Sequence, residues 1–363
     1  MGGIQSENKR KWDDEPEGIP IATKKVAIAL NEKATILTFI NSKVSMCSTG
    51  GPKLTAKSIN ELSDIVQVIA RFNQQLSDNQ VQLLKEEQEA GNSFHNLKHH
   101  HTTYMLLKDA LNKPLDEIIQ WLWRHECPDD VEDQEKDLLQ AVKLILTHFA
   151  GKCRRGRRKI TNSERTFWVS HVIPIFDVFA DQTGLLNFKW CEIYLQAHAD
   201  TIPGMVRYVD GVGLDLSDTE RMVMESSSGE HKENVKHTED DTLKQIHSSI
   251  TMLKTDINNH RNAAFSTMCQ IETFGIHCVK KEITLSKTKL NGATGGYIYQ
   301  EIRSAEIPVT YEERHKWLKM ADLLATLMKL LIAQQKIRDQ LDKENSGYIH
   351  VSENLRVQSV LDI

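Results

Sequence analysis

The hydrophobic pattern of this chain changes character at one strongly basic stretch, Lys152–Lys159, in which six of eight residues are Lys or Arg. Before it, apolar residues recur at spacings of three and four, which is typical of amphipathic helices. After it, β-rich runs alternate with long helical runs, which favours a layered α/β domain. We therefore predict a mainly helical region at 26–151, a basic linker at 152–159 and an α/β domain at 160–343.

Both ends of the chain are polar, so we expect a disordered basic tail at 1–25 and a loose tail at 344–363. Met1–Ser6 fits the loose pattern for N-myristoylation, which would hold a membrane only weakly. Lys9–Lys11 and Lys24–Lys25 fit a two-part nuclear import signal, and a solvated basic tail is the alternative. The sequence contains no secretory signal and no transmembrane segment. A nuclear or cytoplasmic protein that is not secreted is expected.

Capping signals and periodicity predict the helices of the first region. The spacing at Ser58–Glu61 fits a capping box, and the helix it opens is predicted to include Val66, Ile69 and Leu76. A later periodic run continues to Phe149, and Gly151 is expected to end it.

The basic stretch has three possible roles. It could contact nucleic-acid phosphates, it could be a nuclear import element, or it could be an exposed, solvated linker. The net charge of −5 does not decide between them, because overall charge neither favours nor excludes nucleic acid. The residues that would contact phosphates are Arg154, Arg155, Arg157, Arg158 and Lys159.

The second half reads as helix, two strands, long helix, two strands and long helix. Ser163 is predicted to open the first helix, and Pro174 is expected to kink it. Strands are predicted at 206–214, 221–227, 273–286 and 296–307, and the two long helices start near Thr238 and Thr310.

The first two strands carry the residues most suited to chemistry. If they pair around a turn at Ser217–Asp218, Val212 lies opposite Val223 and Asp210 lies opposite Glu225. Two carboxylates this close repel each other, and a divalent cation such as Mg²⁺ or Mn²⁺ would relieve the repulsion. Such a metal can activate water for phosphodiester hydrolysis. The alternative is an exposed Asp at a bend and a Glu beside a serine-rich turn.

This arrangement resembles the PD-(D/E)XK nuclease superfamily. Members place an Asp on the second core strand and a (D/E)-x-K motif on the third; here Val209–Gly211 and Glu225–Ser227 look like these two elements. The resemblance covers 160–335 and implies a mixed sheet flanked by helices. Glu164–Trp168, Asp210–Gly213 and Met224–Gly229 are also similar to a group of uncharacterised fungal proteins.

The resemblance implies roles for individual residues. Asp210 and Glu225 would hold the metal, and Ser227 stands at the lysine position, where a hydroxyl cannot replace a charge. Family members can take a basic residue from a neighbouring helix, and Lys232, Lys236 and Lys244 are the candidates, with Lys244 best placed. Glu164 would be an additional acidic ligand. Alternatively, Lys244 is a surface lysine and Glu164 is a helix N-terminal residue favoured by the dipole.

Histidines are concentrated at His95, His99, His100 and His101. The spacing of four between His95 and His99 places them on one helix face, which is compatible with a metal. Solvated histidines are the favoured interpretation.

These observations lead to three functional hypotheses. The first is a metal-dependent nuclease that uses Asp210, Glu225 and Lys244. The second is a non-catalytic nuclear module that binds nucleic acid or protein on the same fold. In the third, helices of 55–151 bind a protein partner and the second half is a scaffold.

Overall fold

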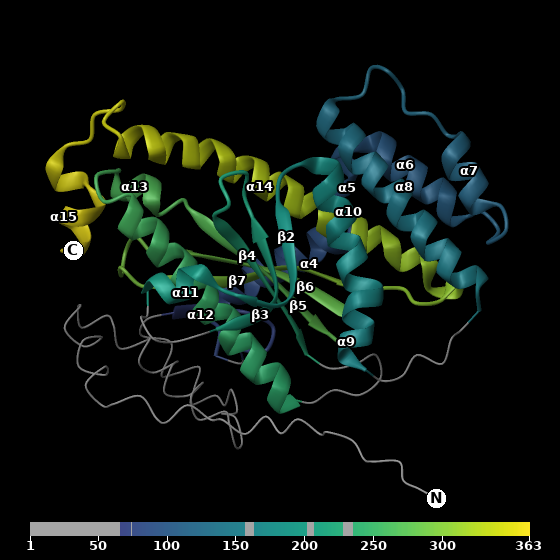
Figure 1. Ribbon diagram of the computed structural model, residues 1–363, viewed down its shortest axis with the longest axis horizontal. Coiled ribbons are helices and arrows are strands. Elements are labelled where there is room, and N and C mark those ends of the chain that lie inside the picture. The colour runs from purple at the N-terminus through teal and green to yellow at the C-terminus, as the bar shows by residue number, and fades with distance from the viewer. Residues whose placement is uncertain (1–65, 74, 157–162, 202–206, 228–234) are drawn as a thin grey trace, which may run out of the picture.

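The computed structural model describes residues 66–73, 75–156, 163–201, 207–227 and 235–363 (Figure 1). The predicted N-terminal tail, the capping box at Ser58–Glu61, the basic residues 157–159 and Lys232 lie outside these ranges. For Lys236, only the backbone is described.

A seven-stranded mixed sheet forms the centre of the described structure, in the order β1-β7-β6-β5-β4-β3-β2. The strands are β1 Val66–Ile69, β2 Asn187–Tyr194, β3 Tyr208–Leu214, β4 Glu220–Ser227, β5 Glu272–Val279, β6 Glu282–Leu290 and β7 Tyr297–Glu306. β2, β3 and β4 form one antiparallel meander, and β5, β6 and β7 form another. The meanders join where β5 lies parallel to β4, and β1 runs parallel to β7 at one edge. The predicted mixed sheet of an α/β protein is confirmed.

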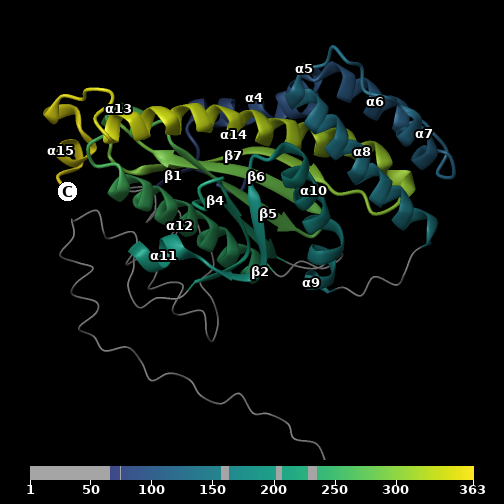
Figure 2. The ribbon, with the colours of Figure 1, turned by 45° about the horizontal axis from the view of Figure 1, so that its top comes forward.

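Helices cover both faces of this sheet. α12 Val235–Asn259 packs on β4 and β5, which it connects, because parallel neighbours need a crossover. α11 Gln196–Thr201 packs beside it. α14 Trp317–Asn345 and α4 Asp78–Asn92 cover the opposite face at β7 (Figure 2). The other helical elements are α5 His95–His99, α6 His101–Leu111, α7 Ile118–Arg124, α8 Asp133–Arg154, α9 Glu164–Phe167, the π-helix η3 Trp168–Val172, α10 Ile173–Thr183, α13 Phe265–Met268, η4 Tyr311–Lys316, η5 Glu353–Leu355 and α15 Val357–Leu361.

The helical region shares its hydrophobic core with the α/β part. Leu107 of α6 and Leu146 of α8 belong to the same buried cluster as Leu324 of α14 and Ile276 of β5. In Figure 1, the helices α5 to α8 lie together at one end of α14. The helical region is therefore packed against the α/β part and shares its core, and it is not a separate domain with its own core.

The predicted end of α8 at Gly151 is wrong, because the helix continues to Arg154. Gly151 is not among the glycines with positive φ, whereas Gly156 has φ of 73° directly after the C-cap residue Arg155. A left-handed glycine in that position is the usual helix stop. The stretch predicted as a linker therefore begins with the last turn of a helix.

Two segments were predicted with the wrong secondary structure. Val66–Ile69 is strand β1 rather than helix, and it pairs with Tyr297–Gln300 of β7. A four-residue apolar run fits either state, so only its distant partner decides. The single strand predicted at 273–286 is a hairpin of β5 and β6, which turns at Lys280 with φ of 56°.

Two further segments differ from expectation. β2 was not predicted, because a bulge at Cys191 and Glu192, both with positive φ, interrupts its alternation. The C-terminal tail is not loose, since Val357 is fully buried and its amide donates to the carbonyl of Ala263 at 2.9 Å. Other elements follow the prediction: Ser163 caps α9, and the helix changes to π geometry just before Pro174.

A buried ion cluster joins β4, α12 and α14. Both carboxylate oxygens of Asp256 accept hydrogen bonds from Arg221 at 2.8 and 3.0 Å, and Arg338 donates a third at 3.0 Å. Burial alone would raise the pKa of Asp256, but Arg338 and Arg221 lower it below its usual range. The ionised carboxylate is therefore stabilised in the folded protein.

We expect Asp256→Ala to lower the free energy of unfolding by about 3–5 kcal/mol, since it removes the buried carboxylate that two largely buried guanidinium groups share. The pKa of Asp256 is lower in the folded protein than in the unfolded chain. The ionised carboxylate therefore stabilises the fold at pH values above its pKa in the unfolded chain, and this stabilisation is lost as the pH falls towards its pKa in the folded protein. Urea unfolding at pH 7 and pH 4 measures both effects. The exposed Asp339→Ala is the control and should change stability by less than ~0.5 kcal/mol. Equal free energies of unfolding for Asp256→Ala and Asp339→Ala would contradict a stabilising role of the Asp256 ion cluster.

Candidate active site

The β3–β4 hairpin has the predicted register. Gly211 pairs with Met224, Val212 with Val223 and Gly213 with Met222. The connecting turn spans Asp215 to Thr219, and Asp218 has a left-handed φ of 57°. The regular pairing ends at Gly211 and Met224, but alternation from the Val212–Val223 pair places Asp210 and Glu225 on one face, as predicted. Asp210 Oδ2 also accepts a hydrogen bond from the Ser226 amide at 2.9 Å.

The glycines of β3 make room for aromatic rings rather than for a ligand or another backbone. A Cβ at Gly211 would lie 2.9 Å from ring atoms of Trp190, and one at Gly213 would lie 3.0 Å from Phe188. Both rings belong to β2. Side chains alternate along a strand, so these rings lie on the face opposite Asp210.

Three carboxylates meet on the face covered by α12. Asp241, in the N-terminal half of α12, is 1% exposed, Glu225 is 3% exposed, and Asp210 is partly buried. Burial raises the pKa of Glu225 well above its usual value, and the neighbouring Asp241 and Asp210 raise it further. Burial also raises the pKa of Asp210, with smaller contributions from Asp241 and Glu164. We call Asp210, Glu225 and Asp241 the carboxylate cluster.

Lys244 supplies positive charge to this cluster. Its Nζ lies 2.6 Å from Asp241 Oδ1, one turn earlier on α12, and its charge also lowers the pKa of Glu225 and of Asp210. Burial opposes the charge of Lys244, but Asp241 and Glu225 raise its pKa, so it stays protonated. The lysine predicted to be best placed is therefore at the cluster, with 30% of its side chain exposed.

Within the described part of the chain, one buried carboxylate oxygen of the cluster lacks a hydrogen-bond partner. Glu225 Oε1 is buried and accepts no hydrogen bond from the described residues. Ionising a buried carboxyl group whose oxygen has no donor is costly, and the raised pKa of Glu225 reflects that cost. A cation at this oxygen would remove that cost, so the oxygen fits a metal ligand.

Ser227, at the position of the family lysine, is fully buried and belongs to the cluster's supporting network. Its Oγ donates to Asp241 Oδ2 at 2.7 Å and lies 2.7 Å from His277 Nε2. The Asp241 carboxylate is ion-paired with Lys244 and therefore acts as an acceptor. The Ser227 proton then goes to Asp241, and His277 Nε2 donates to Ser227. In a nucleophilic triad the histidine lies between serine and carboxylate; here the serine lies between them.

Glu164, the other predicted ligand, is the first residue of α9 and directly follows the N-cap residue Ser163. It interacts electrostatically with Asp210 and raises the pKa of that carboxyl group. The described residues nevertheless contain no group of three or more His, Cys, Asp or Glu side chains arranged to hold a metal ion. Any metal bound here would depend on Asp210 and Glu225 together with water and substrate oxygens.

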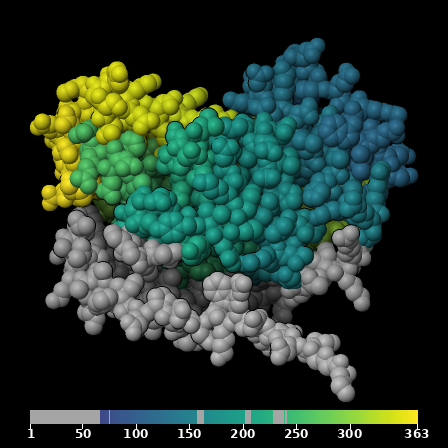
Figure 3. Space-filling model, viewed as in Figure 1, coloured from purple at the N-terminus to yellow at the C-terminus, as the bar shows by residue number. Residues whose placement is uncertain are grey.

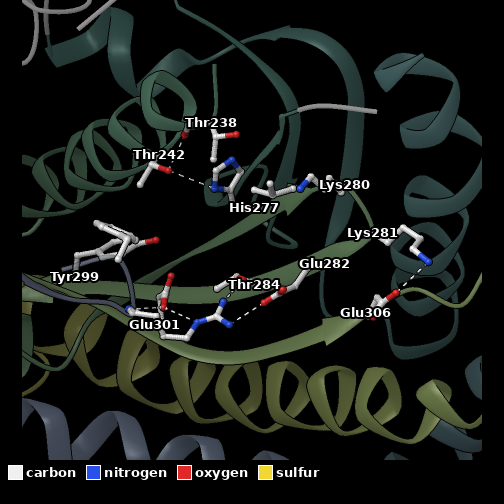
Figure 4. A pocket seen from close by; sticks show the side chains of 13 residues that line it. Thr238, Thr242, His277, Lys280, Lys281, Glu282, Thr284, Tyr299, Glu301 and Glu306 are labelled. Carbon is white, nitrogen blue, oxygen red and sulfur yellow. Dashed lines mark hydrogen bonds and ion pairs between the residues drawn. The ribbon is translucent and has the colours of Figure 1, made fainter. Parts of the chain in front are cut away.

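His277 also lines an open cavity of about 450 Å³, and none of the three cluster carboxylates is among the residues that line it (Figure 4). Thr242 lines the cavity beside His277, whose Nε2 contacts Ser227. Lys280, Tyr299 and Glu301 are among the other lining residues. Arg71 enters this cavity but is bound by Glu301, by Glu282 at 2.8 Å and by Thr284 at 3.0 Å. The charge of this arginine is therefore already satisfied within the protein.

The described part of the basic stretch is bound to the helical region and η3. Lys152 donates to the carbonyl of Ser170, and Arg154 donates to the carbonyls of Leu115, at 3.1 Å, and Asp116. Arg155 is exposed at the end of α8. The predicted phosphate contacts of this stretch remain a prediction.

The sequence did not point to Asp241 or His277 as site residues. For Asp241, the local signals in the sequence are its spacings of three from Thr238, at a helix start, and from Lys244. His277 stands alone in an apolar strand, and only the parallel pairing of β5 with β4 brings it to Ser227.

No protein-family model matches the chain, and searches of curated proteins and of solved structures return no match. Among the described residues, no helix is long and apolar enough to cross a membrane. In the space-filling view, a continuous teal surface lies between the blue residues of the helical region and the yellow C-terminal residues (Figure 3).

We expect Glu225→Gln to raise the thermal midpoint Tm by a few degrees near neutral pH without divalent cations. The amide carries no charge for Asp210 and Asp241 to repel. The pKa of Glu225 is higher in the folded protein than in the unfolded chain. The wild type therefore loses stability as the pH rises from the ordinary pKa of a glutamate to the raised pKa in the folded protein. Thermal scans from pH 5 to 8 should show a weaker pH dependence in the variant. The exposed Glu353→Gln is the matched control; a variant less stable than wild type would refute the repulsion.

Proposed function

We propose that this chain is a metal-dependent nuclease of the PD-(D/E)XK type, with Asp210 and Glu225 as ligands of Mg²⁺ or Mn²⁺. The observation that carries the proposal is the convergence of these two carboxylates with Lys244 around the unpartnered Glu225 Oε1. Perturbed carboxylates beside a lysine are typical of functional sites.

The order of elements supports this proposal. α10 precedes the antiparallel strands β2, β3 and β4, and α12 then leads to β5, which is parallel to β4. Asp210 lies on the second of these strands and Glu225 on the third. These are the positions that the resemblance assigns to the two acidic motifs.

The chemistry expected of the site follows from its charges. A bound divalent ion would activate water and neutralise charge on the phosphodiester. Lys244 would stabilise negative charge that develops on the phosphate, a role that the Ser227 hydroxyl cannot fill. Asp241 would position Lys244 through the 2.6 Å ion pair, and Ser227 would hold Asp241. Glu164, at the start of α9, would add a further negative charge near Asp210.

The second candidate is a non-catalytic module that binds nucleic acid or a protein partner, in the nucleus if the basic clusters direct import. One observation favours it: Ser227 is built into a buried network with Asp241 and His277, so the position no longer presents a side chain to substrate. The exposed basic residue Arg155, with Arg157, Arg158 and Lys159, would then contact phosphates.

We expect Mg²⁺- or Mn²⁺-dependent cleavage of DNA or RNA that falls to background in Asp210→Ala and Glu225→Ala. Lys244→Ala should reduce the rate by about 10²–10³-fold, because it removes one group that stabilises the transition state. Lys336→Ala, an exposed lysine on α14, should cleave at the wild-type rate. The measurement uses labelled single- and double-stranded substrates, with folding checked by circular dichroism.

Two outcomes would contradict the nuclease proposal. Cleavage that persists in both carboxylate variants would come from another site or from a contaminant. Absence of wild-type cleavage on every substrate, with salt-dependent binding retained in Asp210→Ala, would instead support the binding module.

A further inference from the structure

We propose that His95 and His99 form a binding site for a divalent transition-metal ion, such as Zn²⁺, Ni²⁺ or Cu²⁺, on the outer face of α5. The Nε2 atoms of the two rings lie 3.4 Å apart, with ring centroids 4.9 Å apart and ring planes at 90°. Both side chains are exposed, so an ion in solvent can reach them.

The distance between the two nitrogens suits a shared metal better than a hydrogen bond. An N–H donor usually lies ~2.7–3.2 Å from its acceptor, so 3.4 Å is long for a hydrogen bond between the rings. Two imidazoles at ~2.0–2.1 Å from one tetrahedral metal would hold their nitrogens about 3.3 Å apart. The two rings therefore already have the separation that a common metal requires.

The rest of α5 holds this pair in place. Asn96 and Leu97, on the inner face of the same turn, are buried against α14. The Leu97 amide donates to Asp322 Oδ1 at 2.9 Å, and Asn96 Nδ2 donates to Thr326 Oγ1 at 2.8 Å. The four-residue spacing of the ligands is thus fixed by contacts that do not involve their rings. A preorganised pair loses less conformational entropy on binding.

The chemistry of the pair selects the class of ion. Imidazole nitrogen is a good ligand for Zn²⁺, Ni²⁺ and Cu²⁺ and a poor one for Mg²⁺, which prefers oxygen. Since no third His, Cys, Asp or Glu completes a site within the described residues, water would fill the remaining positions. Such a site is open, and it is independent of the carboxylate cluster and of the proposed nuclease activity.

Binding can be measured by isothermal titration of Zn²⁺ and Ni²⁺ into the metal-free full-length protein at pH 7.5. We expect His95→Ala and His99→Ala each to lose one metal site per chain or to lower its affinity at least ~10-fold. Even the loss of an outer-shell partner lowers metal affinity by about 10–100-fold. His101→Ala, an exposed histidine at the start of α6, should keep the wild-type stoichiometry and affinity. The double variant Asp210→Ala/Glu225→Ala should keep this site as well.

Either of two results would overturn the proposal: titrations of His95→Ala and His99→Ala that match the wild type, or an equal loss in His101→Ala. Both substituted side chains are exposed, so we expect the variants to fold as the wild type does, and circular dichroism checks this. Equal spectra and equal Tm values without metal would assign any loss of binding to the removed ligand.

Discussion

The repulsion among Asp210, Glu225 and Asp241 is the constraint on which the rest of the candidate site depends. Ionising three carboxyl groups close together in a largely buried site costs free energy. The raised pKa values of Asp210 and Glu225 reflect that cost. Lys244 offsets part of it, and hydrogen bonds from the Ser226 amide and the Ser227 hydroxyl offset more. A chain that needed only stability would do better with apolar residues here. This cost favours the proposed metal site over a purely structural role for the cluster.

The surrounding fold provides the stiffness that such a cluster requires. Asp210 and Glu225 lie on adjacent strands in the interior of a seven-stranded sheet, and Asp241 and Lys244 lie one turn apart on the helix that crosses it. The Asp256 ion cluster ties the far end of that helix to β4 and α14. The rigid backbone keeps the like charges together instead of letting them separate.

The local features of the site could be predicted from the sequence, and the distant contacts could not. The hairpin register followed from strand alternation and one turn, so the pairing of Val212 with Val223 and the shared face of Asp210 and Glu225 were predicted correctly. Asp241 and His277 come from α12 and β5, whose positions depend on a parallel crossover. Likewise, β1 was predicted as helix because the strand with which it pairs, β7, is more than 200 residues away in sequence. Local periodicity contains no information about such partners.

The helical region bears on the hypothesis that 55–151 binds a protein partner. Its apolar positions, such as Leu107 and Leu146, are buried in the cluster that contains Leu324 of α14. These residues serve the core and are not accessible to another protein. A partner would have to use outward-facing residues such as Trp123, which is 50% exposed.

The most direct test of the central claim is anomalous diffraction from crystals grown with Mn²⁺. Our account predicts an anomalous peak between the Asp210 and Glu225 carboxylates, within about 2.0–2.6 Å of an oxygen of each. That peak should be absent from crystals of Glu225→Gln. Well-ordered carboxylates without a peak at millimolar Mn²⁺ would contradict the claim that the cluster is a metal site.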